Sequence, residues 1–241
     1  MAWRQQGSLW VQSPNSTAKA LVQFIGGSGL GATPQLSYRR LLDALVQRGW
    51  AVQCWPFVPG FDHQLLASDA CRAFRQAAAR QPADLQILRL GHSMGCKLHL
   101  LAPDQGRGCT AQAMMSFNNF AAERSIPLLG ELAPRLGVST EFSPDPIETL
   151  RLIASSKGPE RQLVIRFRSD GLDQSDQLIQ AFPGHSTLLE LAGDHLTPAS
   201  AGLRQQFLGG LGDGSRQNQL DKLADQITLW WNRRNNLRAS K

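Results

Sequence analysis

A short apolar run that ends in Gly-His-Ser-Met-Gly constrains this chain more than any other feature. The run is LQILRLGHSMG, and it places Ser93 at a sharp turn between a predicted strand and a predicted helix. Such a turn is a nucleophile elbow, in which Gly91 and Gly95 leave room for a strained serine backbone. The helix that begins at Met94 would direct its free amides and its positive dipole end toward the serine. The motif therefore predicts a nucleophilic serine.

Composition indicates one globular α/β domain over residues 1–241. Hydrophobic residues make up 42% of the chain and charged residues 18%, without repeats or low-complexity tracts. No apolar stretch reaches the ~18 residues of a membrane span, and the first residues lack the apolar core of a signal peptide. Four widely spaced cysteines favour reduced thiols. We therefore expect a soluble, cytoplasmic protein.

Strand and helix patterns alternate along the chain. We predict strands over residues 8–11, 20–25, 50–57, 85–90, 109–117, 162–167 and 188–192. We predict helices around residues 41–46 and over 67–80, 94–101, 175–182, 199–208 and 216–233. This alternation is typical of an α/β fold with a mostly parallel central sheet and helices on both faces. A proline-bearing segment, 118–156, follows the strand after the nucleophile helix. It is interpreted either as a small cap insertion or as a surface excursion.

A serine nucleophile needs a base and an acid that orients the base. Asp170 and Asp173 follow one late predicted strand, and His195 follows the next. Ser, Asp and His in this order on successive strand ends are typical of the α/β-hydrolase arrangement. Each residue has a structural alternative: Asp170 could cap a turn, Asp173 could cap the following helix, and His195 could bind Asp194. Ser93, His195 and either aspartate are the candidate catalytic residues.

The glycine-rich loop GGSGLG, residues 26–31, follows a strong apolar strand. In a hydrolase this loop supplies one oxyanion donor and the residue after the nucleophile supplies the other, which predicts Met94 with Gly27 and Ser28. The loop also partly matches nucleotide-binding patterns. No acidic residue ends the next strand, however, and Ala32 stands where a phosphate-binding loop needs lysine. The oxyanion interpretation is favoured, and no cofactor or metal is expected.

Four further residues lie where they could line a substrate pocket: Leu30, Phe61, His63 and Phe117. The apolar character of Leu30, Phe61 and Phe117 favours a hydrophobic acyl substrate, although such residues can equally belong to the core.

Several segments together resemble a known family. They are similar to an uncharacterised α/β-hydrolase-like domain-of-unknown-function family of cyanobacteria and chloroplasts. The segments are FIGGSGLGATPQLSYRRLLDALVQRGWAV, FVPGFDHQLLA, GHSMGCKLHLL and MSFNNFAAERSIP. The resemblance spans nearly the whole chain and implies the α/β-hydrolase fold and a cyanobacterial source. The positions of this chain that match the family's motifs are Ser93, the loop Gly26–Gly31 and the late aspartate and histidine positions. The resemblance implies no particular reaction or substrate.

These observations predict a serine hydrolase, such as an esterase, thioesterase or lipase-like enzyme, or an acyltransferase. The expected partner is a small-molecule ester. The alternative is a non-catalytic protein of the same fold that binds a ligand or acts as a scaffold. The net charge of +6 is concentrated near the C-terminal end and lacks interleaved aromatics, which argues against nucleic-acid binding. Trp230 and Trp231 on the last predicted helix indicate docking to the domain or peripheral membrane contact. The oligomeric state stays open.

Overall fold

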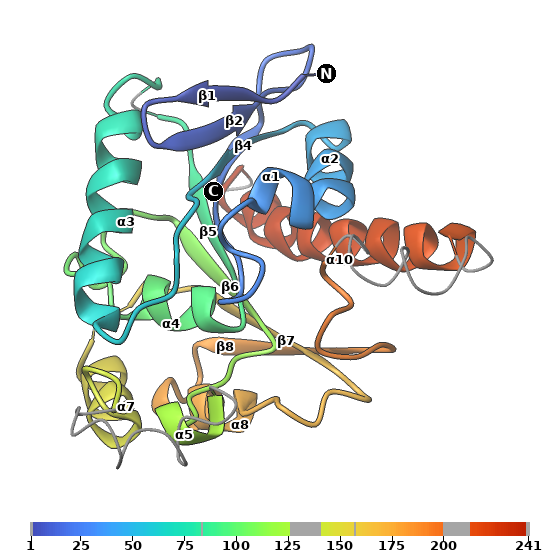
Figure 1. The fold of residues 1–241 in the computed structure, drawn as a ribbon. Coiled ribbons are helices and arrows are strands. Elements are labelled where there is room, and N and C mark those ends of the chain that lie inside the picture. The colour runs from blue at the N-terminus through green and yellow to red at the C-terminus, as the bar shows by residue number, and fades with distance from the viewer. Residues whose placement is uncertain (1, 83, 126–140, 157, 200–212, 240–241) are drawn as a thin grey trace.

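The computed structural model describes residues 2–82, 84–125, 141–156, 158–199 and 213–239, and its centre is an eight-stranded sheet (Figure 1). The strand order is β1-β2-β4-β3-β5-β6-β7-β8. Strand β2 pairs antiparallel with both β1 and β4, and every pairing from β4 to β8 is parallel. The strands are β1 (Arg4–Gln6), β2 (Leu9–Gln12), β3 (Ala20–Ile25), β4 (Trp50–Cys54), β5 (Ile87–His92), β6 (Ala111–Met115), β7 (Gln162–Phe167) and β8 (Ser186–Leu191). The predicted α/β class with a mostly parallel sheet is confirmed.

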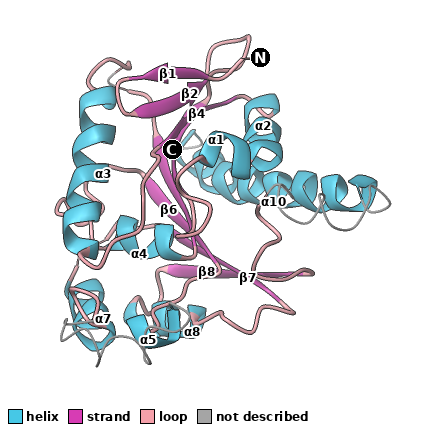
Figure 2. Ribbon diagram, in the orientation of Figure 1, coloured by secondary structure: helices cyan, strands magenta, loops and turns pink. Residues whose placement is uncertain are grey.

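Helices cover both faces of the sheet, as Figure 2 shows. One face carries α1 (Pro34–Ser37), α2 (Arg39–Gln47) and α10 (Asp213–Ala239), and the other carries α3 (His63–Ala78), α4 (Met94–Leu100) and α8 (Ser175–Ala181). Two further helices, α5 (Ala122–Ser125) and α7 (Pro146–Ser155), lie near α8 at one end of the molecule. None of the described helices is both long and apolar enough to cross a membrane.

Two local differences from the predicted elements have physical causes. Helix α3 begins at His63 rather than at residue 67, because the Asp62 carboxylate caps it and accepts the amide hydrogen of Leu65 at 2.8 Å. Strand β1 has no apolar alternation and is not predicted from the sequence, since it forms only by pairing with β2. The predicted helix 199–208 lies almost entirely outside the described residues.

The tryptophans of α10 pack against the domain. Trp231 is buried and meets Trp50 edge to face, with ring centroids 5.0 Å apart. The Arg161 guanidinium lies 4.5 Å from the Trp230 ring centroid. The structure therefore uses both rings for docking the helix, and peripheral membrane contact through its basic end stays a prediction.

A buried ion pair anchors the strand that leads to Ser93. Arg89 of β5 is nearly inaccessible to solvent, and its two terminal nitrogens each donate to one oxygen of Asp104, one of them at 2.7 Å. The Asp104 carboxylate also accepts the amide hydrogen of Gly106. These contacts lower the pKa of Asp104, against the opposing effect of burial. The pair thereby fastens the loop between α4 and β6 to the centre of the sheet.

Replacement of Asp104 by alanine should lower the free energy of unfolding by about 2–4 kcal/mol, because the buried Arg89 charge then lacks its partner. The matched control is Asp176→Ala, which breaks the exposed pair with Arg166 and should cost less than about 1 kcal/mol. Urea titration at pH 7 measures both. Because the folded-state pKa of Asp104 is lowered, its contribution should be present above pH ~4 and decrease as the pH falls further. Equal losses in the two variants at pH 7 would contradict a structural role for the pair.

Candidate active site

Ser93 occupies a strained turn between β5 and α4. Its backbone angles are φ 55° and ψ −121°, outside the regions that side-chain-bearing residues normally adopt. A Cβ on Gly95 would collide with the carbonyl of Ile25, and a Cβ on Gly91 would lie 2.7 Å from the backbone of Cys96. The Ser93 amide donates to the carbonyl of Met115 at 2.9 Å. The turn is thus held by close backbone packing that only glycine at both positions permits.

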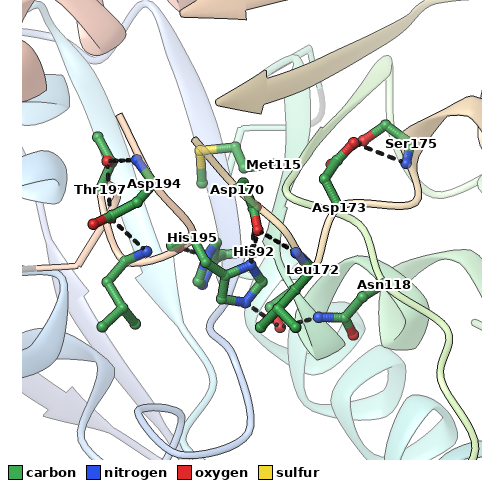
Figure 3. A network of polar contacts seen from close by, with 12 residues as sticks. His92, Met115, Asn118, Asp170, Leu172, Asp173, Ser175, Asp194, His195 and Thr197 are labelled. Carbon is green, nitrogen blue, oxygen red and sulfur yellow. Dashed lines mark hydrogen bonds and ion pairs between the residues drawn. The ribbon is translucent and has the colours of Figure 1, made fainter. Parts of the chain in front are cut away.

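His195 reaches Ser93 from the loop after β8. Its Nε2 lies 3.1 Å from Ser93 Oγ. The loop is shaped by Asp194, whose carboxylate accepts the Leu196 amide hydrogen at 3.0 Å and whose own amide donates to Thr197 Oγ1 at 2.7 Å (Figure 3). The sequence alternative, in which His195 binds the side chain of Asp194, is not the arrangement seen.

Asp170 and Asp173 take different positions in the loop after β7 (Figure 3). The Asp170 carboxylate is shielded from solvent and lies 2.9 and 3.1 Å from His195 Nδ1. It also accepts the Leu172 amide hydrogen at 2.9 Å. Asp173 accepts instead from the hydroxyl and amide of Ser175, at the start of α8. The candidate role of Asp173 as the acid beside His195 is therefore wrong, because its carboxylate is engaged by the helix terminus.

Asn118 is a site residue that sequence reasoning missed. Its Nδ2 donates to Ser93 Oγ at 3.0 Å. The residue follows β6, and β6 neighbours β5 in the sheet, so its position just past a strand end adjacent to the elbow was the available signal. Ser93 Oγ thus accepts a hydrogen bond from Asn118 and can donate its own proton to His195.

A buried hydrogen-bonded chain links the glycine loop to His195. The Gly27 amide donates to the Tyr38 hydroxyl at 2.8 Å, and that hydroxyl lies 2.8 Å from His92 Nδ1. His92 Nε2 lies 2.8 Å from the His195 carbonyl, which can only accept, so the Nε2 proton is donated to it. His92 Nδ1 is then an acceptor from Tyr38. Burial and the nearby His195 lower the pKa of His92 to about 3, which keeps the ring neutral, and its two hydrogen-bond partners set the tautomer.

The same chain corrects the candidate oxyanion donors. The Gly27 amide is engaged by Tyr38, so it does not face a reacting carbonyl. Ser28 and Met94 both line the cavity around Ser93. Within the described ranges their amides have no protein acceptor, and Met94 begins α4, where the first amides lack helical partners. Ser28 and Met94 are therefore the amides that remain for an oxyanion.

A cavity of about 380 Å³ opens over Ser93. Leu30, Phe61 and His63 line it, at positions that the sequence suggested. Phe117 does not: its side chain is fully buried in a core cluster with Cys96 and Met114. The lining also includes residues that were not predicted, namely Lys97, Asn118, Phe120, Arg124, Phe142 and Leu172. Across the part of the chain that the structure describes, no group of three or more His, Cys, Asp or Glu side chains is arranged to hold a metal ion.

Comparison with solved structures assigns the fold. An esterase domain of a Rhodothermus marinus protein superposes with a TM-score of 0.60, at 17% identity over 92% of this chain and 90% of that one. A thioesterase domain from the curacin biosynthetic pathway gives a TM-score of 0.60, at 13% identity over 95% and 98%. A serine hydrolase without a lid from Xanthomonas campestris gives 0.59, at 15% identity over 93% and 88%. The chain has the α/β-hydrolase fold.

The sequence itself identifies a family. Residues 2–227 match the family described as "Protein of unknown function (DUF1350)", and the chain belongs to it. No curated protein matches the sequence.

Tyr38→Phe should lower the free energy of unfolding by about 1–3 kcal/mol, because it leaves the Gly27 amide and His92 Nδ1 buried without partners. The phenyl ring keeps the packing of Tyr38 against Phe24 and His92. The control, Ser68→Ala, removes an exposed hydroxyl of α3 and should change stability by less than about 0.5 kcal/mol. Thermal and urea unfolding measure both variants. A Tyr38→Phe protein as stable as wild type would show that the chain of hydrogen bonds is not structurally important.

Proposed function

We propose that this protein is a serine hydrolase that cleaves a carboxylic ester or thioester through an acyl-serine intermediate. The observation that carries the proposal is the hydrogen-bonded series Asp170–His195–Ser93, which ends at a hydroxyl facing a cavity. The distances of 2.9 and 3.1 Å along it are those required for proton transfer. The esterases and thioesterase of the same fold support this reaction class.

In the proposed first half-reaction, Ser93 Oγ attacks the carbonyl carbon of the substrate while its proton passes to His195 Nε2. Asp170 accepts a hydrogen bond from the Nδ1–H group of His195. This bond orients the ring and stabilises the imidazolium. The negative charge on the carbonyl oxygen is met by the amides of Ser28 and Met94. His195 then returns the proton to the departing alcohol or thiol, and the acyl group stays on Ser93.

In the second half-reaction, water gives a proton to His195 and its oxygen attacks the acyl carbon. The tetrahedral intermediate collapses, Ser93 recovers its proton from His195, and a carboxylic acid leaves. An acceptor alcohol in place of water would make the same site an acyltransferase. Phe120, Arg124 and Phe142 belong to the described parts of segment 118–156 and line the cavity, which supports the interpretation of these parts as a small cap. Residues 126–140 of the segment lie outside the described residues.

The pair of loop aspartates provides a matched test of the assignment. With p-nitrophenyl butyrate as substrate, Asp170→Asn should lower kcat by about a thousand-fold or more, because the amide no longer stabilises the tautomer that accepts the serine proton. In Asp173→Asn the side-chain oxygen can still accept a hydrogen bond at the start of α8, so this variant should lower kcat by less than about ten-fold. Ser93→Ala sets the background rate, and circular dichroism checks that each variant is folded.

A larger loss of kcat in Asp173→Asn than in Asp170→Asn would contradict the proposed site. Hydrolysis by wild type that Ser93→Ala does not abolish would contradict the proposed reaction itself.

A further inference from the structure

Two polar side chains of the cavity lining have no hydrogen-bond or ion-pair partner among the described residues. Lys97 is 3% exposed and His63 is 2% exposed, and both line the cavity over Ser93. Among the described residues, Lys97 forms no hydrogen bond or ion pair, and neither ring nitrogen of His63 has a hydrogen-bond partner. A buried cation without a partner costs free energy, since the interior solvates charge far less well than water does. An arrangement of this kind indicates a ligand that supplies the missing partner.

The two side chains share one wall of the cavity. Lys97 belongs to α4, four residues after Ser93, and both residues line the cavity. His63 is the first residue of α3. Phe142 joins them: its ring centroid is 4.2 Å from that of His63, and Lys97 Nζ lies 5.4 Å from it. The ammonium group is therefore held against aromatic surface rather than against a carboxylate.

The charges around Lys97 favour an anion. Glu141 acts on the lysine at a distance: its Oε1 accepts the amide hydrogens of Ala122 and Phe142, and it makes no ion pair with Lys97. No Asp or Glu belongs to the described cavity lining, whereas Arg124 lies in it as a second cation. Burial lowers the pKa of Lys97 to about 8, so the group is still mostly protonated at pH 7. Burial and Lys97 lower the pKa of His63 to about 3, so His63 adds no second positive charge to this wall of the cavity.

We propose that Lys97 forms a subsite for a carboxylate group of the substrate. The substrate would then be an ester or thioester that carries a free carboxylate at a distance from the scissile bond. The ammonium group, which has three hydrogen-bond donors, matches a single negative charge with two hydrogen-bond acceptors. The apolar residues Leu30, Phe61 and Phe142 would accommodate the chain between the two ends. This inference names the substrate class of the proposed hydrolase and rests on it.

Binding to a variant that cannot turn over separates the subsite from the reaction. The Ser93→Ala protein is titrated by calorimetry at pH 7 with monomethyl adipate, which has one ester and one carboxylate, and with dimethyl adipate, its neutral counterpart. We expect the monoester to bind at least about ten-fold more tightly, a difference of about 1.4 kcal/mol. Adding Lys97→Met should bring the ratio of the two dissociation constants close to one.

Lys222→Met is the matched control, because it removes the same charge from α10, a helix of the opposite face of the sheet. The affinity ratio should be the same in this variant as in Ser93→Ala alone. Equal binding of the two esters, or a preference for the monoester that survives Lys97→Met, would overturn the subsite.

The subsite and the proposed reaction can fail separately. If wild type hydrolyses neutral p-nitrophenyl esters through Ser93 and the monoester shows no binding preference, the hydrolase remains and the carboxylate subsite is wrong. If the preference depends on Lys97 and no ester is hydrolysed, the subsite remains and the proposed reaction is wrong.

Discussion

The strained turn at Ser93 is the constraint on which the rest of the site depends. A serine with φ 55° is tolerated only because α4 packs directly against the end of β3, where Gly95 meets the backbone of Ile25. This packing directs the Ser93 side chain away from the sheet and into the space above the strand ends. In a parallel sheet the carboxyl ends of neighbouring strands share one edge, so the loops after β6, β7 and β8 converge on the same hydroxyl. Asn118, Asp170 and His195 arrive in this way.

The histidines differ in how far their side chains are buried. His63, His92 and His99 are enclosed, and desolvation lowers the pKa of each to about 3, so they act as neutral groups. His92 uses its neutral form structurally, since one nitrogen accepts from Tyr38 while the other donates to the His195 carbonyl. His195 is different, because its side chain is 18% exposed and bonded to a carboxylate. Of these four histidines, His195 is the one whose ring is hydrogen-bonded to a carboxylate.

Much of this arrangement is predictable from the amino-acid sequence, and the remainder is not, for a physical reason. Strand ends are visible as apolar runs that stop, so the sequence alone is enough to select Ser93, Asp170 and His195 as candidates. It does not decide between Asp170 and Asp173, because both follow β7 and only the folded loop shows which carboxylate faces His195. Tyr38 and Lys97 have no sequence signature, since a tyrosine is usually a packing residue and a lysine a surface residue. The prediction for Gly27 is wrong because the hydroxyl that engages its amide comes from Tyr38, at the junction between α1 and α2.

The central claim is that Ser93 is an activated nucleophile, and covalent labelling with a fluorophosphonate tests it most directly. The reagent phosphonylates a serine only where a base removes the hydroxyl proton and an oxyanion site receives the phosphoryl oxygen. Intact mass spectrometry of the wild-type protein should show one adduct per chain, located on the peptide that contains Ser93, and the Ser93→Ala protein should show none. A wild-type protein that stays unlabelled, or an adduct that persists in Ser93→Ala, would contradict the account.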